Sequence, residues 1–200
     1  MYNVVYEDKY LIGIDKLCVV PTIRLGQSAG LSDELILEFP MLAKIQDFGI
    51  THRLDNETLG IIIVAKDQTT YTKLRDLFNN KKIYKTYHAR VCGHMKGNAG
   101  VIDTPIAHDS KSDKKMLAVK DGYRIYRGKA RPALTHWTLL SSNPGTSDLE
   151  LVANTGVRHQ IRVHLASIGH CICGDVLYGK TGFDHPSLML ISKKLVFIHP

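Results

Sequence analysis

Short apolar runs separated by polar breaks open the chain, a pattern typical of β-strands. Residues 4–6 form one run, residues 11–14 form the next, and the polar residues 7–9 lie between them. Two apolar runs with a polar break of this length predict two short strands within residues 3–20, joined by a turn.

A short helix is expected after this strand pair. Ser32 is a candidate N-cap for a helix that starts at Asp33, because its hydroxyl can accept a hydrogen bond from an early backbone N–H. The helix must end near Pro40, because a proline inside a helix removes a backbone donor and clashes with the preceding turn.

The clearest strand and helix lie between residues 60 and 80. Positions 61–64 are all β-branched, which predicts a buried strand over residues 60–66. Asp67 follows as a candidate N-cap. Four apolar residues then recur at helical spacing: Tyr71, Leu74, Leu77 and Phe78. They predict a helix that packs this face on the core and ends at residues 79–80.

Strand patterns return in the second half of the chain. We expect strands over residues 83–91, with Gly93 as a stop, and over residues 133–140 and 149–153. The last two are separated by residues 141–145, which are rich in turn formers.

The apolar spacing becomes helical from residue 157 onward. Thr155 is a candidate N-cap, and Gly169 stands where a left-handed C-cap belongs. One helical face is expected to hold four apolar residues: Val157, Ile161, Leu165 and Ile168.

Strands outnumber helices and do not alternate regularly with them, which predicts an α+β fold rather than a doubly wound one. We expect a mainly antiparallel or mixed β-sheet with flanking helices. A length of 200 residues favours a single domain over residues 1–200. The content of 44% hydrophobic and 22% charged residues excludes a mainly disordered chain.

The net charge narrows the class of partner. A formal charge of +7 and a pI near 9.2 suit a polyanion such as nucleic acid, although a solvated basic surface is the alternative. The first residues show no basic region followed by an apolar run, and no stretch approaches the roughly 20 apolar residues of a membrane span. We therefore expect a cytoplasmic protein without a membrane partner.

The cysteines do not follow the spacing of a secreted disulfide scaffold, which predicts reduced thiols. Cys92-x-His94 and His170-Cys171-x-Cys173 contain only fragments of zinc-ligand spacing. We expect small buried cysteines and no metal ion. The four are Cys18, Cys92, Cys171 and Cys173.

A charged cluster at residues 51–60 lies directly before the predicted buried strand. Packing does not explain its Arg53 and Asp55, and a loop on a rigid strand often holds catalytic groups. By itself, the segment is equally consistent with a turn that contains an N-capping Asp.

Together with two later segments, this cluster resembles the signatures of the RluA-type family of pseudouridine synthases. The first segment reads HRLDNETLGIIIVAK at residues 52–66. The second is Lys-x-Tyr-x-Ala-x-Val-x-Gly at residues 85–93, and the third is TGVRHQIRVHL at residues 155–165. Residues 174–179 and the apolar end of the chain are also family-like. Three ordered signatures are far more specific than one.

The resemblance implies the pseudouridine synthase catalytic-domain fold and an isomerase that converts specific uridines in structured RNA, without a cofactor. It assigns Asp55 as the catalytic carboxylate and Arg162 as its ion-pair partner. It places Tyr87 against the target uracil, where an aromatic ring suits a flipped base. Taken alone, Tyr87 on a strand is more often a core residue.

Three basic residues are the candidates for RNA contacts: Arg53, Lys85 and Arg158. Arg158 is expected one helical turn before Arg162, and Arg53 is placed to fill the gap left by a flipped base or to contact the backbone. Structural salt bridges or solvated side chains are the alternatives. His52, His159 and His164 are expected to act as hydrogen-bonding scaffold rather than catalytic groups.

The chain departs from the family pattern at several positions. Leu59 replaces the usual Ser, Val157 replaces a basic residue, and Leu17 and Cys18 replace Pro and a small residue after Lys16. Family chains commonly continue past the final His-Pro, whereas this sequence stops at Pro200. Asp55, Tyr87 and Arg162 are unaffected.

We therefore expect RNA to be recognised by the catalytic domain itself, without a separate RNA-binding module. The expected partner is a stem-loop of rRNA or tRNA, read mainly through shape and phosphate contacts, by a monomer. A catalytically idle RNA-binding relative and a metal-binding regulatory domain are the alternative hypotheses.

Overall fold

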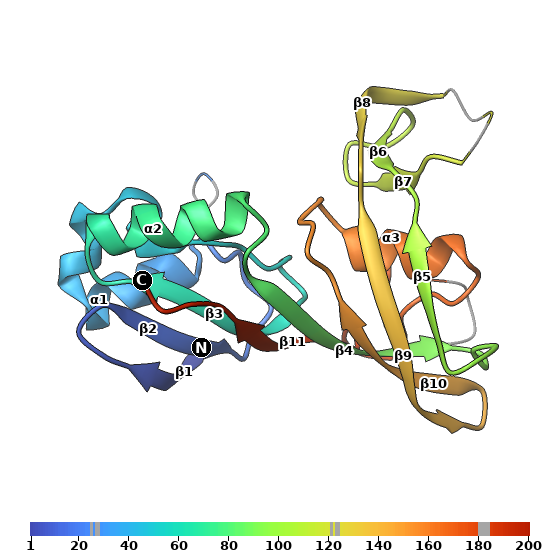
Figure 1. Ribbon diagram of the computed structural model, residues 1–200, viewed down its shortest axis with the longest axis horizontal. Coiled ribbons are helices and arrows are strands. Elements are labelled where there is room, and N and C mark those ends of the chain that lie inside the picture. Colours follow the sequence, from blue (N-terminus) through green and yellow to red (C-terminus); the bar gives the residue numbers. More distant parts are fainter. Residues whose placement is uncertain (25, 27–28, 121, 123–124, 180–184) are drawn as a thin grey trace. The chain divides into compact units, whose positions relative to one another are not determined.

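The structure is a computed structural model that describes all residues of the chain except 25, 27–28, 121, 123–124 and 180–184 (Figure 1). The chain forms two compact units. The first, unit 1, contains Met1–Tyr84 and Ile191–Pro200, and the second, unit 2, contains Lys85–Leu190.

Four strands form the sheet of unit 1, in the order β1-β2-β3-β11. β1 pairs with β2 and β2 with β3 in antiparallel fashion, whereas β3 and β11 are parallel. Their bounds are Tyr2–Glu7 for β1, Leu11–Lys16 for β2, Leu59–Ala65 for β3 and Leu190–Val196 for β11. The predicted strand pair at the start and the predicted strand before Asp67 are confirmed.

The helices of unit 1 lie between and after these strands. They are α1 (Leu31–Glu38), α2 (Gln68–Asn79) and the 3₁₀ turns η1 (Pro40–Lys44) and η2 (Gln46–Gly49). The carboxylate of Asp67 accepts a hydrogen bond from the N–H of Thr70 at 2.8 Å, so the predicted cap of α2 is confirmed. Figure 1 shows α2 alongside β3.

The predicted cap of α1 is wrong. The helix begins at Leu31, and the carboxylate of Asp33 accepts from the N–H of Gly30 at 2.8 Å. Ser32 lies inside the helix, where its hydroxyl accepts from the N–H of Arg24 at 3.1 Å. Its hydrogen bond therefore anchors the preceding segment instead of capping the helix.

Unit 2 contains two antiparallel sheets. The larger has the order β4-β10-β9-β5, with bounds Tyr84–Cys92, Thr146–Val152, Leu134–Asn143 and Ala99–Asp103. The smaller has the order β7-β6-β8, with bounds Met116–Ala118, Ile106–Asp109 and Tyr126–Arg131. The strands expected around residues 83–91, 133–140 and 149–153 are confirmed, whereas β5 and the strands of the smaller sheet had no sequence prediction.

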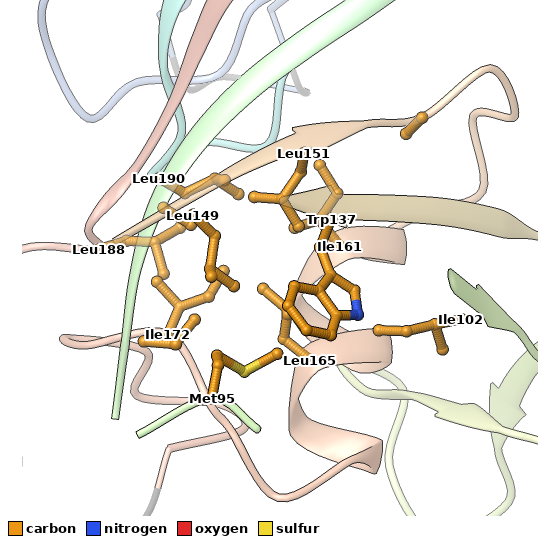
Figure 2. Close-up of a cluster of buried hydrophobic side chains, with 13 residues drawn as sticks. Met95, Ile102, Trp137, Leu149, Leu151, Ile161, Leu165, Ile172, Leu188 and Leu190 are labelled. Atoms are coloured by element: carbon orange, nitrogen blue, oxygen red, sulfur yellow. The ribbon is translucent and has the colours of Figure 1, made fainter. Parts of the chain in front are cut away.

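A buried cluster joins the larger sheet to helix α3 (Gln160–Ser167). Figure 2 shows Ile161 and Leu165 of this helix packed with Trp137 of β9 and with Leu149 and Leu151 of β10. Burial of these side chains removes apolar surface from water, which is the main force that fixes α3 against the sheet.

The predicted start of this last helix is wrong. Thr155 does not cap it: the Thr155 hydroxyl accepts from the N–H of Leu134 at 3.1 Å and contacts Oε1 of Gln160 at 2.9 Å. The helix begins only at Gln160, after His159 in a left-handed conformation with φ of 55°. Val157 therefore packs in a different cluster, with Val163 and residues of the smaller sheet.

The end of the helix agrees better with the sequence. Gly169 has φ of 91°, the left-handed conformation expected of a C-cap. Ile168 is 41% exposed, so the apolar face predicted for the helix is shorter than expected. The predicted α+β class with mainly antiparallel pairing is confirmed. Among the described helices, none combines the length and the apolar character needed to cross a membrane.

Candidate active site

Asp55 lies in a loop that unit 1 holds in place at both ends. Thr51 donates its hydroxyl to the carbonyl of Ile63 at 2.9 Å, and Nε2 of His52 accepts from the N–H of the same residue at 3.2 Å. The N–H of Thr58 donates to the carbonyl of Asp55 at 3.0 Å, which closes a turn. Asp55 is partly exposed at this turn.

Lys16 anchors this turn from the protein interior. Its side chain is fully buried, and its Nζ donates to the carbonyl oxygens of Asp55 at 3.1 Å, Asn56 at 2.7 Å and Thr58 at 3.1 Å. An ammonium has three donors, and each meets one carbonyl. Burial lowers the pKa of Lys16 to about 8. The charged form is therefore held in the interior by main-chain dipoles.

Lys16 had no role among the sequence predictions, although the pattern of β2 indicates one. Ile12, Ile14 and Lys16 alternate along β2, so all three side chains point to the same face of the sheet. A lysine on the buried face of a strand needs partners, which was a reason to seek polar groups around it.

Thr22 adds a second anchor next to Asp55. Its hydroxyl donates to the carbonyl of Leu54 at 2.9 Å and accepts from the N–H of Leu54 at 3.2 Å. Both backbone groups of the residue before Asp55 are thus satisfied inside the protein. Arg53 is exposed to solvent.

Lys85 and Tyr87 lie two residues apart on β4, so they share one face of the strand. Nζ of Lys85 donates to the carbonyl of Thr155 at 2.9 Å, and burial lowers the pKa of this lysine to about 8. A Cβ added at Gly156 would lie 3.4 Å from this Nζ, so the glycine leaves room for the ammonium. Tyr87 is partly buried and packs against the cluster in Figure 2.

Arg162 is buried in unit 2 and forms a two-pronged ion pair with Asp175. Its Nε donates to Oδ2 and its Nη2 donates to Oδ1, both at 2.8 Å. The exposed fraction of the arginine side chain is 1%, which excludes the solvated alternative for this residue. Asp175 lies in the family-like stretch of residues 174–179, where no single residue had an expected role.

Arg158 does not lie on the helix of Arg162, which corrects the expectation. It precedes the left-handed His159, because the helix begins at Gln160. Arg158 is exposed, and its guanidinium lies 3.5 Å from the carbonyls of Asp113 and Lys114. These long contacts leave its charge close to solvent.

The signature histidines are hydrogen-bonded within the protein. His52 has the contact to Ile63 described above, and Nδ1 of His159 lies 2.8 Å from the hydroxyl of Tyr178. His164 is buried, with Nδ1 2.8 Å from the hydroxyl of Thr135 and Nε2 2.9 Å from the carbonyl of Thr104. Burial lowers the pKa of His164, so its neutral form is favoured.

Three cysteines form a buried cluster in unit 2: Cys92, Cys171 and Cys173. The sulfurs of Cys92 and Cys173 are 3.7 Å apart, and all four cysteines of the chain are free thiols. Within the described part of the chain, no group of three or more His, Cys, Asp or Glu side chains is arranged to hold a metal ion.

The six residues named from the sequence thus lie in two groups. Arg53 and Asp55 belong to unit 1, whereas unit 2 holds the other four, namely Lys85, Tyr87, Arg158 and Arg162. The structure adds Lys16 and Thr22 to the first group and Asp175 and Tyr178 to the second.

The chain is similar in sequence to a family of RNA-modifying proteins and to several of its members. The family described as RNA pseudouridylate synthase matches residues 10–167. An uncharacterized RNA pseudouridine synthase of Aquifex aeolicus (strain VF5) is 34% identical over 214 residues, which cover 99% of this chain and 65% of that protein. Ribosomal large subunit pseudouridine synthase D of Zymomonas mobilis is 32% identical over 216 residues, with 99% and 65% covered. This chain therefore spans just under two thirds of the length of both relatives.

Two solved human structures share the fold. RNA pseudouridylate synthase domain containing 1 has a TM-score of 0.81 at 24% identity, with 98% of this chain and 78% of that chain covered. RNA pseudouridylate synthase domain containing 4 has a TM-score of 0.77 at 26% identity, with 98% and 84% covered. The fold implied by the sequence signatures is confirmed.

Proposed function

The chain belongs to the RNA pseudouridylate synthase family, and from this membership we propose that it isomerises uridine in structured RNA to pseudouridine. The reaction breaks the glycosidic bond, turns the uracil and rejoins it through a ring carbon. It transfers no electrons to a carrier, so the proposal includes no cofactor. It requires a fixed carboxylate near the sugar–base junction and a route for the ring proton.

The observation that carries this proposal is the anchoring of the Asp55 turn. Three hydrogen bonds donated by the buried Lys16, together with one donated and one accepted by Thr22, hold the main chain on both sides of the carboxylate. Catalysis depends on such positioning, because a displacement of about 1 Å can lower a rate roughly 100-fold. If the turn had only a structural role, its buried hydrogen bonds to Lys16 and Thr22 would not need to position a partly exposed carboxylate.

From the resemblance to the family signatures we assign three catalytic roles. Asp55 is the catalytic carboxylate, and Arg162 is its ion-pair partner, which keeps the carboxylate charged and oriented. Tyr87 stacks on the uracil, which must leave the base stack before the glycosidic bond can be reached.

The charges of unit 2 support RNA as the substrate. Basic residues gather on or beside the strands of the smaller sheet, and Arg127 among them is paired with Asp113. The others in the described part of the chain include Lys111, Lys114, Lys115, Lys120, Lys129, Arg131 and Arg158. Each phosphate that such residues neutralise releases counterions and adds affinity. We assign the RNA contacts to Arg53, Lys85 and Arg158. Of these three, only Arg158 lies among the basic residues near the smaller sheet.

The substrate class follows from the relatives. Since one of them is named for the ribosomal large subunit, we propose an rRNA stem-loop as the first substrate to test and a tRNA stem-loop as the second. In this proposal residues 1–200 act as one catalytic domain, as a cytoplasmic monomer.

A carbodiimide-based pseudouridine map of total RNA tests the proposal. We compare a strain that lacks the gene with its parent, and restore either the wild-type protein or the Asp55→Asn variant. Discrete uridines should lose their signal in the deletion strain and regain it only with the wild type. An unchanged map, together with no product from purified protein on rRNA and tRNA transcripts, would favour an idle RNA binder instead.

A further inference from the structure

The two-pronged ion pair of Arg162 indicates a further residue that contributes to the reaction, in addition to the three catalytic residues. We propose that Asp175 is a positioning residue that fixes the direction of the Arg162 guanidinium, with Tyr178 as its support. This inference rests on the proposed function, because it concerns the arginine assigned there to Asp55.

The carboxylate of Asp175 is itself rigidly held. Beside the two bonds from Arg162, its Oδ1 accepts from the N–H groups of Leu177 at 3.0 Å and Tyr178 at 3.1 Å. Its side chain is completely buried. The backbone before it allows no side chain, because a Cβ at Gly174 would lie 2.0 Å from the carbonyl of Ser187. Asp175 is thus a fixed acceptor rather than a mobile counterion.

Tyr178 restricts the position of the Arg162 guanidinium from another side. Cζ of Arg162 lies 5.5 Å from the centre of the Tyr178 ring, within range of a cation–π contact. The hydroxyl of this tyrosine accepts from the N–H of Met116 at 2.9 Å and lies 2.8 Å from Nδ1 of His159. The smaller sheet and the residue before α3 therefore hold the ring in place.

These contacts determine what Arg162 can bind. Asp175 uses the N–H of Nε and one N–H of Nη2, so a further acceptor can reach only the remaining N–H groups, two on Nη1 and one on Nη2. Asp175 also offsets the positive charge, which weakens attraction to RNA phosphates. An arginine held in this way suits one acceptor in one direction, and we infer that Asp175 fixes the direction in which Arg162 presents its remaining N–H groups.

The test compares Asp175→Asn and Asp175→Glu with a matched control. Asp148→Asn is the control, because Asp148 accepts from Nε and Nη2 of Arg90 at 2.7 and 3.0 Å in the same geometry, outside the proposed site. We measure kcat and KM on one RNA transcript, and the folded fraction of each protein by thermal unfolding.

We expect Asp175→Asn to lower kcat by about 100-fold with little change in KM, because a displaced guanidinium affects the reaction and not RNA binding. Asp175→Glu keeps the charge and should recover part of kcat, and Asp148→Asn should match the wild type. If Asp175→Asn does not fold, the Glu variant decides: a folded protein with reduced kcat and unchanged KM supports the role.

Two results would overturn the inference. The first is a wild-type kcat in either folded Asp175 variant. The second is a loss of kcat that only follows the lost folded fraction. Neither result affects the proposed function, which fails only if the wild-type protein forms no pseudouridine on any transcript.

Discussion

Nζ of Lys16 donates a hydrogen bond of 3.1 Å to the backbone carbonyl of Asp55. The same ammonium also donates to the carbonyls of Asn56 and Thr58, so one buried charge holds three main-chain carbonyls of the turn. The lysine therefore controls the path of the main chain under the carboxylate.

Lys16→Met should destabilise the protein by about 3 kcal/mol, because it leaves three buried carbonyls without their donor. Urea unfolding measures the change in the free energy of unfolding. The exposed Lys73 on α2 provides the control, and Lys73→Met should change stability by less than about 0.5 kcal/mol. Equal stability of the two variants would contradict the anchoring role of Lys16.

Asp55→Asn should abolish turnover and leave the melting temperature within a few degrees of the wild type, because Asp55 is partly exposed. Glu57→Gln, in the same turn, removes an equal charge and should retain most activity. Mass spectrometry of digested RNA measures the product. A near-normal yield from Asp55→Asn would contradict the assigned mechanism.

Activity should fall as pH rises through about 8, the pKa of Lys16. A neutral amine has only two N–H groups, so one of the three carbonyls loses its donor and the turn loosens. The effect on stability has the opposite sign. Between pH 8 and the ordinary pKa of 10.5, the unfolded chain holds more protons at Lys16 than the folded one, so this contribution to the free energy of unfolding rises with pH.

Lys85 also has a pKa of about 8, so its contribution must be separated. A pH profile of kcat for Lys85→Met, from about pH 7 to about pH 9.5, makes the distinction. If the fall above pH 8 persists in this variant, it belongs to Lys16. A profile that becomes flat would assign it to Lys85 instead.

His164 should make the protein sensitive to acid. Its folded pKa is lowered by burial, so the unfolded chain binds the proton more readily, and the free energy of unfolding falls as pH drops below the ordinary value of 6.5. Urea unfolding at about pH 7 and about pH 5 measures this slope. His164→Gln should show a smaller loss between the two pH values, and an unchanged slope would exclude this residue as the cause.

RNA affinity should decrease steeply with salt, and Arg53→Ala should reduce the slope of log affinity against log salt by about 1 if Arg53 contacts one phosphate. Arg53 is exposed, so the variant should fold normally. Filter binding at several salt concentrations gives the slope. An identical slope in wild type and variant would mean that Arg53 meets the base or the protein instead.

The sequence predicted those elements whose signals are local. The β-branched run at residues 61–64 and the capping Asp67 predicted β3 and the start of α2, because both depend on neighbours in the chain. β8 was not predicted, because the residues that alternate with its three basic side chains are Tyr126, Gly128 and Ala130, and glycine and alanine are rare in strands and give little apolar signal. Its pairing with β6 is what makes it a strand.

The same difference between local and tertiary signals decided which residues of the site could be predicted from the sequence. The signatures identified Asp55 and Arg162 as single positions, and strand alternation would have pointed to Lys16. The pairing of Arg162 with Asp175 joins residues from α3 and the following loop, and its geometry depends on tertiary packing that no local pattern contains. The left-handed conformation of His159 likewise makes the helix shorter than predicted. A glycine at this position would have indicated such a conformation, but a histidine does not.

The buried cysteine cluster has a practical consequence for reagents. Thiolates react with maleimides, and burial raises the pKa of Cys92 and Cys173, while Cys171 is equally enclosed. Cys18 is the one cysteine of the four that is partly accessible. In the folded state the natural chain should therefore accept a fluorescent dye at a single position, two residues from the lysine under the Asp55 turn, without any engineered cysteine.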